Sequence, residues 1–107
     1  MFELDDNGFI TSWSNGAELI FGYDEAEVLG MHVSILFAPG ELQNHIAVDL
    51  LHRTETVGSH VAFVWHKHKS GKEFWAYNEG HLLGAAEKWG FCRSASEWTV
   101  GQSVAYR

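Results

Sequence analysis

The sequence predicts an α+β domain in which a five-stranded antiparallel sheet carries short helices packed on one face. Three observations support this class. Strand-like segments stand near both ends of the chain, with helix-like segments between them. Tight turns containing Gly join neighbouring strand segments, as antiparallel pairing requires. The chain has 107 residues, of which 46% are hydrophobic and 20% charged, a balance typical of one packed domain.

The first half of the chain is predicted to begin with a hairpin and to continue as short helices. Residues 2–5 and 9–14 are the two strands, and the turn between them contains Asn7 and Gly8, which tolerate positive φ. Asn15 is expected to cap a helix that ends at Gly22, because apolar residues then follow at helical spacing.

The middle of the chain reads as further helical segments. Asp24 is expected to cap a short helix that Gly30 ends, and a short apolar stretch over residues 31–37 follows. Pro39 and Gly40 end that stretch. Residues 41–53 contain no helix breaker, so the sequence predicts one continuous helix there.

The last part of the chain is predicted to form three strands. Residues 59–67 and 72–83 are joined by a hairpin turn over residues 69–71. A turn over residues 84–88 leads to a fifth strand over residues 89–99. The predicted order is therefore two strands, several short helices and three strands.

Charge and composition exclude several classes of function. The net charge of −7 disfavours binding to nucleic acid or to an anionic membrane surface. The single Cys92 excludes a disulfide framework and a cysteine-rich zinc site. No apolar run is long enough for a transmembrane helix, and no export signal is recognisable, so we expect a cytoplasmic location. Because Met1 leads directly into a strand, we also expect the chain to be part of a longer protein.

Residues 8–23, GFITSWSNGAELIFGY, together with residues 25–30, EAEVLG, resemble the signature of PAS domains. Residues 69–75 resemble the hairpin of that family and residues 90–99 resemble its last strand, although Glu97 stands where many members have Asp. The resemblance implies a PAS sensory domain over residues 1–99 and a linker toward an effector domain over residues 100–107.

The same resemblance implies a function. Such domains act within larger signalling proteins, such as sensor histidine kinases, detect a ligand, gas or redox state in an internal pocket, and catalyse no reaction. An alternative is a cofactor-free module for dimerisation or protein interaction. In that alternative Trp75, Tyr77 and Trp98 would anchor a homodimer. The sequence contains no nucleophile elbow, phosphate loop or metal motif, which agrees with a protein that is not an enzyme.

Alternation along residues 72–83 predicts which side chains face inward. Phe74, Ala76, Asn78 and Gly80 share one face, and the resemblance suggests that this face is covered by helices. The row beyond Phe74 is small, so we expect a roomy pocket that a cofactor could contact through Ala76, Asn78 and Gly80. In the alternative, Phe37 or Leu42 fills the space with an ordinary core.

Haem b is the leading cofactor candidate. A gapless match to the haem-binding PAS domains of rhizobial oxygen sensors puts His45 at the axial-ligand position, and His60 would then be a distal donor to bound oxygen. Two observations weigh against haem. The arginine of those sensors has no counterpart near His60 or Ala62, and Asn78 and Gly80 stand where that family has larger apolar distal residues. Helical periodicity also places His45 off the stripe of apolar residues.

Flavins are less favoured. Photochemistry of the LOV type with FMN needs a cysteine where this chain has Val33, and polar amides where it has His66, Ala76 and Ala95. Non-covalent FAD stays open, with Asn78 as a possible partner of the ring edge. His66 and His68 could be a zinc pair, but a solvated hairpin rich in lysine is the simpler interpretation.

Overall fold

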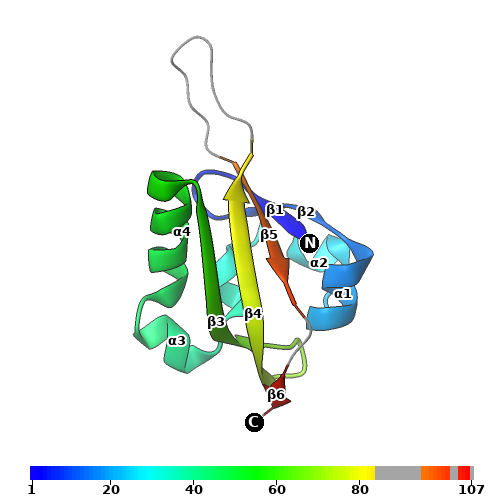
Figure 1. Cartoon of the computed structure of the whole chain (residues 1–107). Coiled ribbons are helices and arrows are strands. Elements are labelled where there is room, and N and C mark those ends of the chain that lie inside the picture. The colour runs from blue at the N-terminus through cyan, green and yellow to red at the C-terminus, as the bar shows by residue number, and fades with distance from the viewer. Residues whose placement is uncertain (84–94, 102–103, 107) are drawn as a thin grey trace.

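A computed structural model shows one antiparallel sheet with the helices gathered behind it (Figure 1). The structure describes residues 1–83, 95–101 and 104–106. The elements, in chain order, are β1 (Phe2–Leu4), β2 (Ile10–Trp13), α1 (Asn15–Phe21), α2 (Glu25–Val28), the 3₁₀ helix η1 (Val33–Leu36), α3 (Pro39–Gln43), α4 (Ile46–Val57), β3 (Ser59–Lys67), β4 (Glu73–Leu82), β5 (Ser96–Val100) and β6 (Ala105–Tyr106).

The strand order across the sheet is β2-β1-β5-β4-β3, and all pairs are antiparallel. The short strand β6 pairs with the beginning of β4, while β5 pairs with its second half, so β5 and β6 follow one another along the same edge. The predicted class, an α+β domain with an antiparallel sheet and short helices, is confirmed.

Local sequence signals account for the first two helices. The Ser14 side chain caps α1 by accepting from the backbone N–H of Ala17 at 3.1 Å, so the cap lies one residue before the predicted Asn15. Gly22 ends α1 with φ 82°, a left-handed conformation that suits glycine. The predicted cap at Asp24 is confirmed, and Glu27 completes a capping box with it.

The predicted helix over residues 41–53 is wrong, because the structure has two helices there. Pro39 occupies the first turn of α3, and the chain then breaks at His45, whose φ of 59° is left-handed. A tertiary contact accompanies the break. The Glu41 side chain accepts from the backbone N–H of Trp65 at 2.7 Å and ties α3 to the edge of β3, whereas α4 turns its buried residues toward the sheet.

The core lies between the inner face of the sheet and the helices. It contains aromatic and aliphatic side chains from every layer, among them Phe2, Phe21, Leu36, Phe37, Val64, Phe74 and Trp98. Within the described part of the chain, no helix is both long enough and apolar enough to cross a membrane.

The predicted last strand and linker lie only partly within the described residues. The strand expected over residues 89–99 is seen as β5 from Ser96, and residues 84–94 lie outside the described part. The linker predicted over residues 100–107 begins with Val100, which is buried at the end of β5, and continues as β6 on the sheet.

Candidate functional site

The inner face of the sheet carries a row of buried polar side chains. Residues 74, 76, 78 and 80 of β4 are buried and alternate with more exposed neighbours, which confirms the predicted inward face. On β3 the register places His60 opposite Gly80 and His66 opposite Phe74. Both histidines and Asn78 therefore point into the core, where they are 3% exposed or less.

Five groups form one continuous hydrogen-bonded chain through the interior, which we call the internal polar chain: Thr54, His60, Asn78, His66 and the carbonyl of Leu36. The distances are 2.6 Å from Thr54 Oγ1 to His60 Nδ1 and 2.5 Å from His60 Nε2 to Asn78 Oδ1. They are 3.0 Å from Asn78 Nδ2 to His66 Nε2 and 2.9 Å from His66 Nδ1 to Leu36 O. Buried polar groups are costly unless paired, and here each one has a partner.

The proton positions in this chain follow from its ends. Leu36 O and Asn78 Oδ1 can only accept, so His66 donates from Nδ1 and His60 donates from Nε2. The amide of Asn78 then donates to His66 Nε2, which makes His66 neutral. With His60 neutral as well, the hydroxyl of Thr54 donates to its Nδ1.

One hydroxyl allows the internal polar chain to accept a further proton. Thr54 Oγ1 also lies 2.8 Å from the carbonyl of Leu50, which is a second acceptor for its hydrogen. If His60 gains a proton, His60 Nδ1 can donate to Thr54 while the hydroxyl turns to Leu50. The two protonation states of His60 therefore use the same heavy-atom positions.

Burial keeps both histidines neutral near pH 7. Desolvation lowers the pKa of His66 to about 4, although its hydrogen bond to Leu36 acts in the opposite direction. Desolvation is also the largest cause that lowers the pKa of His60, and the hydrogen bond to Asn78 opposes it. The internal polar chain thus contains two neutral imidazoles joined by the Asn78 amide.

Aromatic rings fix the internal polar chain on both sides. The His60 ring packs edge-to-face on Trp98 with centroids 4.6 Å apart, and the His66 ring lies 4.8 Å from that of Phe37. Gly80 makes room for this arrangement, because a Cβ there would lie 2.5 Å from His60 Cε1. The space over Gly80 is thus taken by a side chain from β3.

The structure brings together three of the predicted site residues. His60, Asn78 and Gly80 meet at one point of the core, and Ala76 is buried beside them on the same face of β4. His45 is not part of this group. It is exposed at the junction of α3 and α4, so its position lends no support to its predicted role as a haem ligand.

Sequence reasoning missed two members of the internal polar chain. His66 was expected in a solvated hairpin, which is wrong, because it is fully buried. The sequence did contain a signal for His66. Even-numbered residues of β3 pair with even-numbered residues of β4, and the even-numbered residues of β4 point inward, so His66 should point inward too. Thr54 carried no comparable signal, since only the break at His45 decides which face of α4 points inward.

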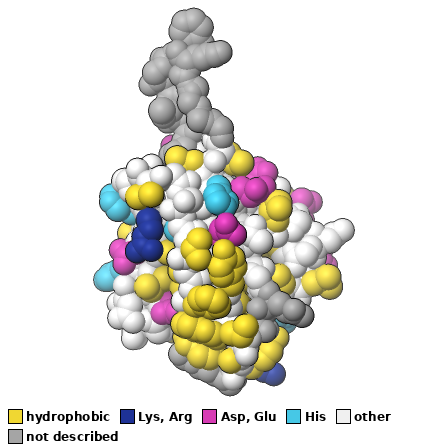
Figure 2. Space-filling model, in the orientation of Figure 1, with side chains coloured by type: hydrophobic (Ala, Val, Ile, Leu, Met, Phe, Trp, Pro, Cys, Tyr) yellow, Lys and Arg dark blue, Asp and Glu magenta, His cyan; other side chains and the backbone are white. Residues whose placement is uncertain are grey.

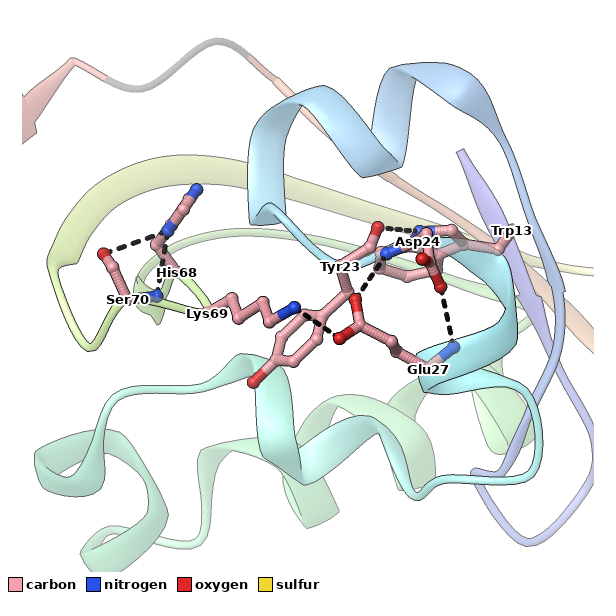
Figure 3. A network of polar contacts seen from close by, with 7 residues as sticks. All are labelled: Trp13, Tyr23, Asp24, Glu27, His68, Lys69 and Ser70. Atoms are coloured by element: carbon pink, nitrogen blue, oxygen red, sulfur yellow. Dashed lines mark hydrogen bonds and ion pairs between the residues drawn. The ribbon is translucent and has the colours of Figure 1, made fainter.

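A second polar network ties the β3–β4 turn to α2 (Figure 3). Lys69 Nζ pairs with Glu27 Oε2, and Glu27 Oε1 accepts from the backbone N–H of Asp24. Trp13 Nε1 donates to the carbonyl of Tyr23 at 2.9 Å and closes the loop before α2. Asp24, Glu27 and Lys69 are exposed and Trp13 is buried, and their polar groups satisfy one another, so the network is a structural clamp.

The outer face of the sheet is apolar over its lower half (Figure 2). We define the outer aromatic patch as Val61, Phe63, Trp65, Trp75 and Tyr77. Phe63 is 52% exposed and stacks on Trp75 with centroids 6.1 Å apart. Trp98, which the sequence suggested for this face, is fully buried in the core, so that expectation is wrong.

Comparison with known sequences identifies relatives of the chain. The sequence pattern of the family described as the PAS fold matches residues 1–93. Two-component system protein A of Emericella nidulans is 33% identical over 76 residues, which make up 71% of this chain and 11% of that protein. The chain thus corresponds to a small part of this relative.

Solved structures share the architecture. The PAS domain of a protein from Colwellia psychrerythraea superposes with a TM-score of 0.78 at 22% identity, covering 96% of this chain and 83% of that one. The PAS domain of the quorum-sensing receptor RpfR of Cronobacter turicensis, in complex with BDSF, has a TM-score of 0.63 at 19% identity and covers 89% and 87% of the two chains. At these identities the likeness shows the fold.

Proposed function

The chain belongs to the PAS family, and we propose that it is the sensor module of a larger signalling protein such as a sensor histidine kinase. The two-component relative supports this role, because the matched segment is a small part of a much longer chain. The effector would be another domain of the same polypeptide.

The internal polar chain is the observation that carries this proposal. Two buried histidines contribute less to stability than apolar residues of the same shape would, since their burial is only offset by their partners. The chain also joins three elements that a sensor must couple, namely α4 through Thr54, the sheet through Asn78, and η1 through Leu36. A ligand or proton that changes one bond must therefore change the others.

We propose that a change in the internal polar chain passes to the C-terminal residues through Asn78. This residue is directly opposite Val100 in the pairing of β4 with β5, and Gly80 is opposite Trp98. Val100 is the first residue of the predicted linker, and the β6 residues that follow return to β4 beside Phe74. A change at Asn78 would reach residues 100–107 through backbone pairing, as a shift between two populated states.

The ligand we propose is a small molecule or a proton rather than haem. The exposed position of His45 gives haem no support, and the two buried histidines are each bonded through both ring nitrogens. The RpfR domain was solved with a small ligand bound, which supports a ligand-binding role for a domain of this fold.

We also propose that the chain is not an enzyme. Thr54 and His60 have the spacing of a nucleophile with its base. However, Thr54 is only 1% exposed, and the far nitrogen of His60 faces an amide oxygen rather than a carboxylate. The pair is suited to holding the interior together.

Replacing Thr54 tests the proposal, and Thr56 provides a matched control on the same helix. Thr54→Val removes the outer end of the internal polar chain, whereas the exposed Thr56, among the described residues, bonds only to His52 O of its own helix. We expect Thr54→Val to shift backbone amide NMR signals along β4 and β5 and at residues 104–106. Thr56→Val should affect only α4. Changes confined to α4 in both variants would overturn the relay.

The outer aromatic patch favours homodimerisation as a second candidate function. Contiguous apolar surface of this kind is typical of contacts between proteins, and its residues Val61 and Phe63 are more than half exposed. Sedimentation velocity of the purified chain should show a dimer that Phe63→Ser weakens. Leu19→Ser on α1, where the side chain is 84% exposed, is the control. Equal sedimentation of all three proteins as monomers would exclude this function.

A further inference from the structure

Of the two buried histidines, His60 can gain a proton without losing a hydrogen bond. Its Nδ1 lies 2.6 Å from Thr54 Oγ1, and that hydroxyl lies 2.8 Å from Leu50 O. In the neutral form the hydroxyl donates to Nδ1. In the protonated form Nδ1 donates to the hydroxyl oxygen, and the hydroxyl donates to Leu50 O. Protonation of His60 therefore requires only the rotation of one hydroxyl, and the bond to Asn78 is kept.

His66 lacks this freedom. Its Nε2 accepts from Asn78 Nδ2 at 3.0 Å, and its Nδ1 donates to Leu36 O. A proton on Nε2 would face the amide N–H, so two donors would meet unless the Asn78 amide turned over. The turned amide would set its N–H against His60 Nε2, which is also a donor, so His60 would have to change its tautomer. Protonating His66 thus rearranges the whole internal polar chain, and we expect His60 to be protonated first.

The charge that a proton brings to His60 is not balanced inside the core. Among the residues that the structure describes, none forms an ion pair with His60. Desolvation by burial is the main cause of the lowered pKa of His60, and the Asn78 hydrogen bond opposes it. Arg53 and His81 lower this pKa further, whereas Glu79 raises it. The titratable and charged groups around His60 are Arg53 on α4, Glu79 and His81 on β4, Glu97 on β5 and His66 on β3.

The outer end of the internal polar chain lies at the wall of a cavity. Thr54 is only 1% exposed, yet it lines a cavity of about 200 Å³ together with Leu51 of α4 and Ser96 of β5. A cavity of this volume is large enough for water. The Thr54 hydroxyl can receive a proton from water as it passes its own to His60 Nδ1, so a proton from solvent can reach the imidazole without a large movement of the fold.

We propose that the stimulus of this domain is a fall in pH, detected by His60 as the uptake of one proton from the side of Thr54. The inference rests on the proposed sensor function and names its stimulus. This conformation holds His60 neutral, so a conformation in which α4 moves away and exposes the imidazole binds the proton more tightly. Below about pH 6.5, the ordinary value for histidine, one proton changes the ratio of the two populations by up to about tenfold per pH unit.

Side-chain ¹⁵N NMR of the histidines in the purified chain, followed from about pH 7.5 to about pH 5, tests this inference. At the upper end we expect His60 to carry its proton on Nε2 alone. As the pH falls, Nδ1 should be protonated as well, before His66 titrates. The backbone amide signals of residues 100 and 104–106 should shift with the same midpoint as His60.

Two matched pairs of variants assign the response to its groups. In His60→Gln the amide can donate to Asn78 and accept from Thr54 but does not titrate, so the response of residues 104–106 should be lost. His52→Gln is the control, because His52 is an exposed histidine on α4 outside the internal polar chain. Thr54→Ser keeps the hydroxyl and should keep the midpoint. Thr54→Val should lower it by about one pH unit, because a charged donor loses more than a neutral acceptor.

Other outcomes separate this inference from the proposed function. If His60 stays neutral down to about pH 5, or if residues 104–106 still respond in His60→Gln, the proton switch is overturned. Loss of dispersed amide signals across the chain before His60 titrates would mean unfolding and would also overturn it. If Thr54→Val moves residues 104–106 but pH does not, the relay stands and the proton switch alone falls. If His60 titrates while neither pH nor Thr54→Val moves those residues, both fall.

Discussion

At the scale of single residues, the interior is organised around a histidine that needs a glycine beside it. The ring of His60 occupies the space where a side chain on residue 80 would lie, and it bonds to Thr54 and Asn78 on its two sides. Asn78 is the only amide side chain in the internal polar chain, and it fixes which nitrogen of each histidine carries the proton.

Gly80→Ala should disturb this centre. The new methyl would lie 2.5 Å from His60 and 2.9 Å from Trp98, both buried, so one ring must move. We expect the free energy of unfolding in urea to fall by about 1–3 kcal/mol, as for other overpacked cores. Gly40→Ala is the control, because a Cβ there meets nothing within 4 Å and Ala favours helix α3. Equal stabilities of the two variants would contradict the close fit.

Stability should depend on pH through His66. Its pKa is about 4 in the folded state against about 6.5 in an unfolded chain, so the unfolded chain binds more protons between these values. The free energy of unfolding should therefore fall as pH falls from 6.5 to 4, by about 3 kcal/mol in all. The lowered pKa of His60 acts in the same direction. Urea unfolding at several pH values measures this.

His66→Gln separates the titration from the hydrogen bonds. Glutamine can accept from Asn78 and donate to Leu36 O, but it does not titrate. The variant should show a flatter dependence on pH over this window. An unchanged slope would mean that other groups cause it.

At the scale of elements, the helices with local caps could be predicted from the sequence, and the break between two other helices could not. Helices α1 and α2 were predictable because their caps are local, with Ser14 or Asp24 before the helix and Gly22 after the first. The break at His45 was not, because no helix breaker marks it, and the contact beside it joins Glu41 to Trp65, 24 positions away in the sequence. The inward row of β4 was predictable from alternation alone, whereas the bonding of Asn78 to two histidines required the pairing of β3 with β4.

His45→Gly should stabilise the junction between α3 and α4. Residue 45 has φ 59°, a conformation that costs an L-residue about 1–2 kcal/mol. Glycine removes this cost, but part of the gain is offset because glycine raises the entropy of the unfolded chain. We expect a net gain of about 0.5–1 kcal/mol in the free energy of unfolding. His45→Val should lower stability instead, because a branched side chain tolerates this conformation poorly. A loss of stability in the glycine variant would show that the His45 side chain makes a favourable contact.

At the scale of the whole molecule, the sheet has two unlike faces and a C-terminal strand that returns to it. The inner face is polar at its centre and sealed by helices, and the outer face carries the outer aromatic patch. Strand β6 then brings Tyr106 beside Phe74, with the ring centroids 6.2 Å apart and Lys72 Nζ 5.0 Å above the Tyr106 ring.

Truncation after Gly101 tests whether residues beyond the predicted boundary belong to the fold. Loss of the aromatic pair and of the cation–π contact should lower the free energy of unfolding by about 1–2 kcal/mol. Tyr106→Phe keeps the ring and should therefore lower stability less than the truncation does. If the truncated chain is as stable as the complete one, residues 104–106 act as a linker alone, as the sequence predicted.

The two edge strands of the sheet, β2 and β3, are partly covered by neighbouring segments of the chain. An unpaired strand rim is a template on which other chains can add and aggregate. Here the segment after α2 lies along β2, where Ile10 N–H donates to Met31 O at 2.8 Å and Gly30 N–H donates to Ile10 O at 2.9 Å. On the opposite border Ala38 N–H donates to Trp65 O at 2.9 Å and covers the end of β3. The segments after α2 and after η1 thus cover part of each rim, which leaves less unpaired backbone on which another chain could add.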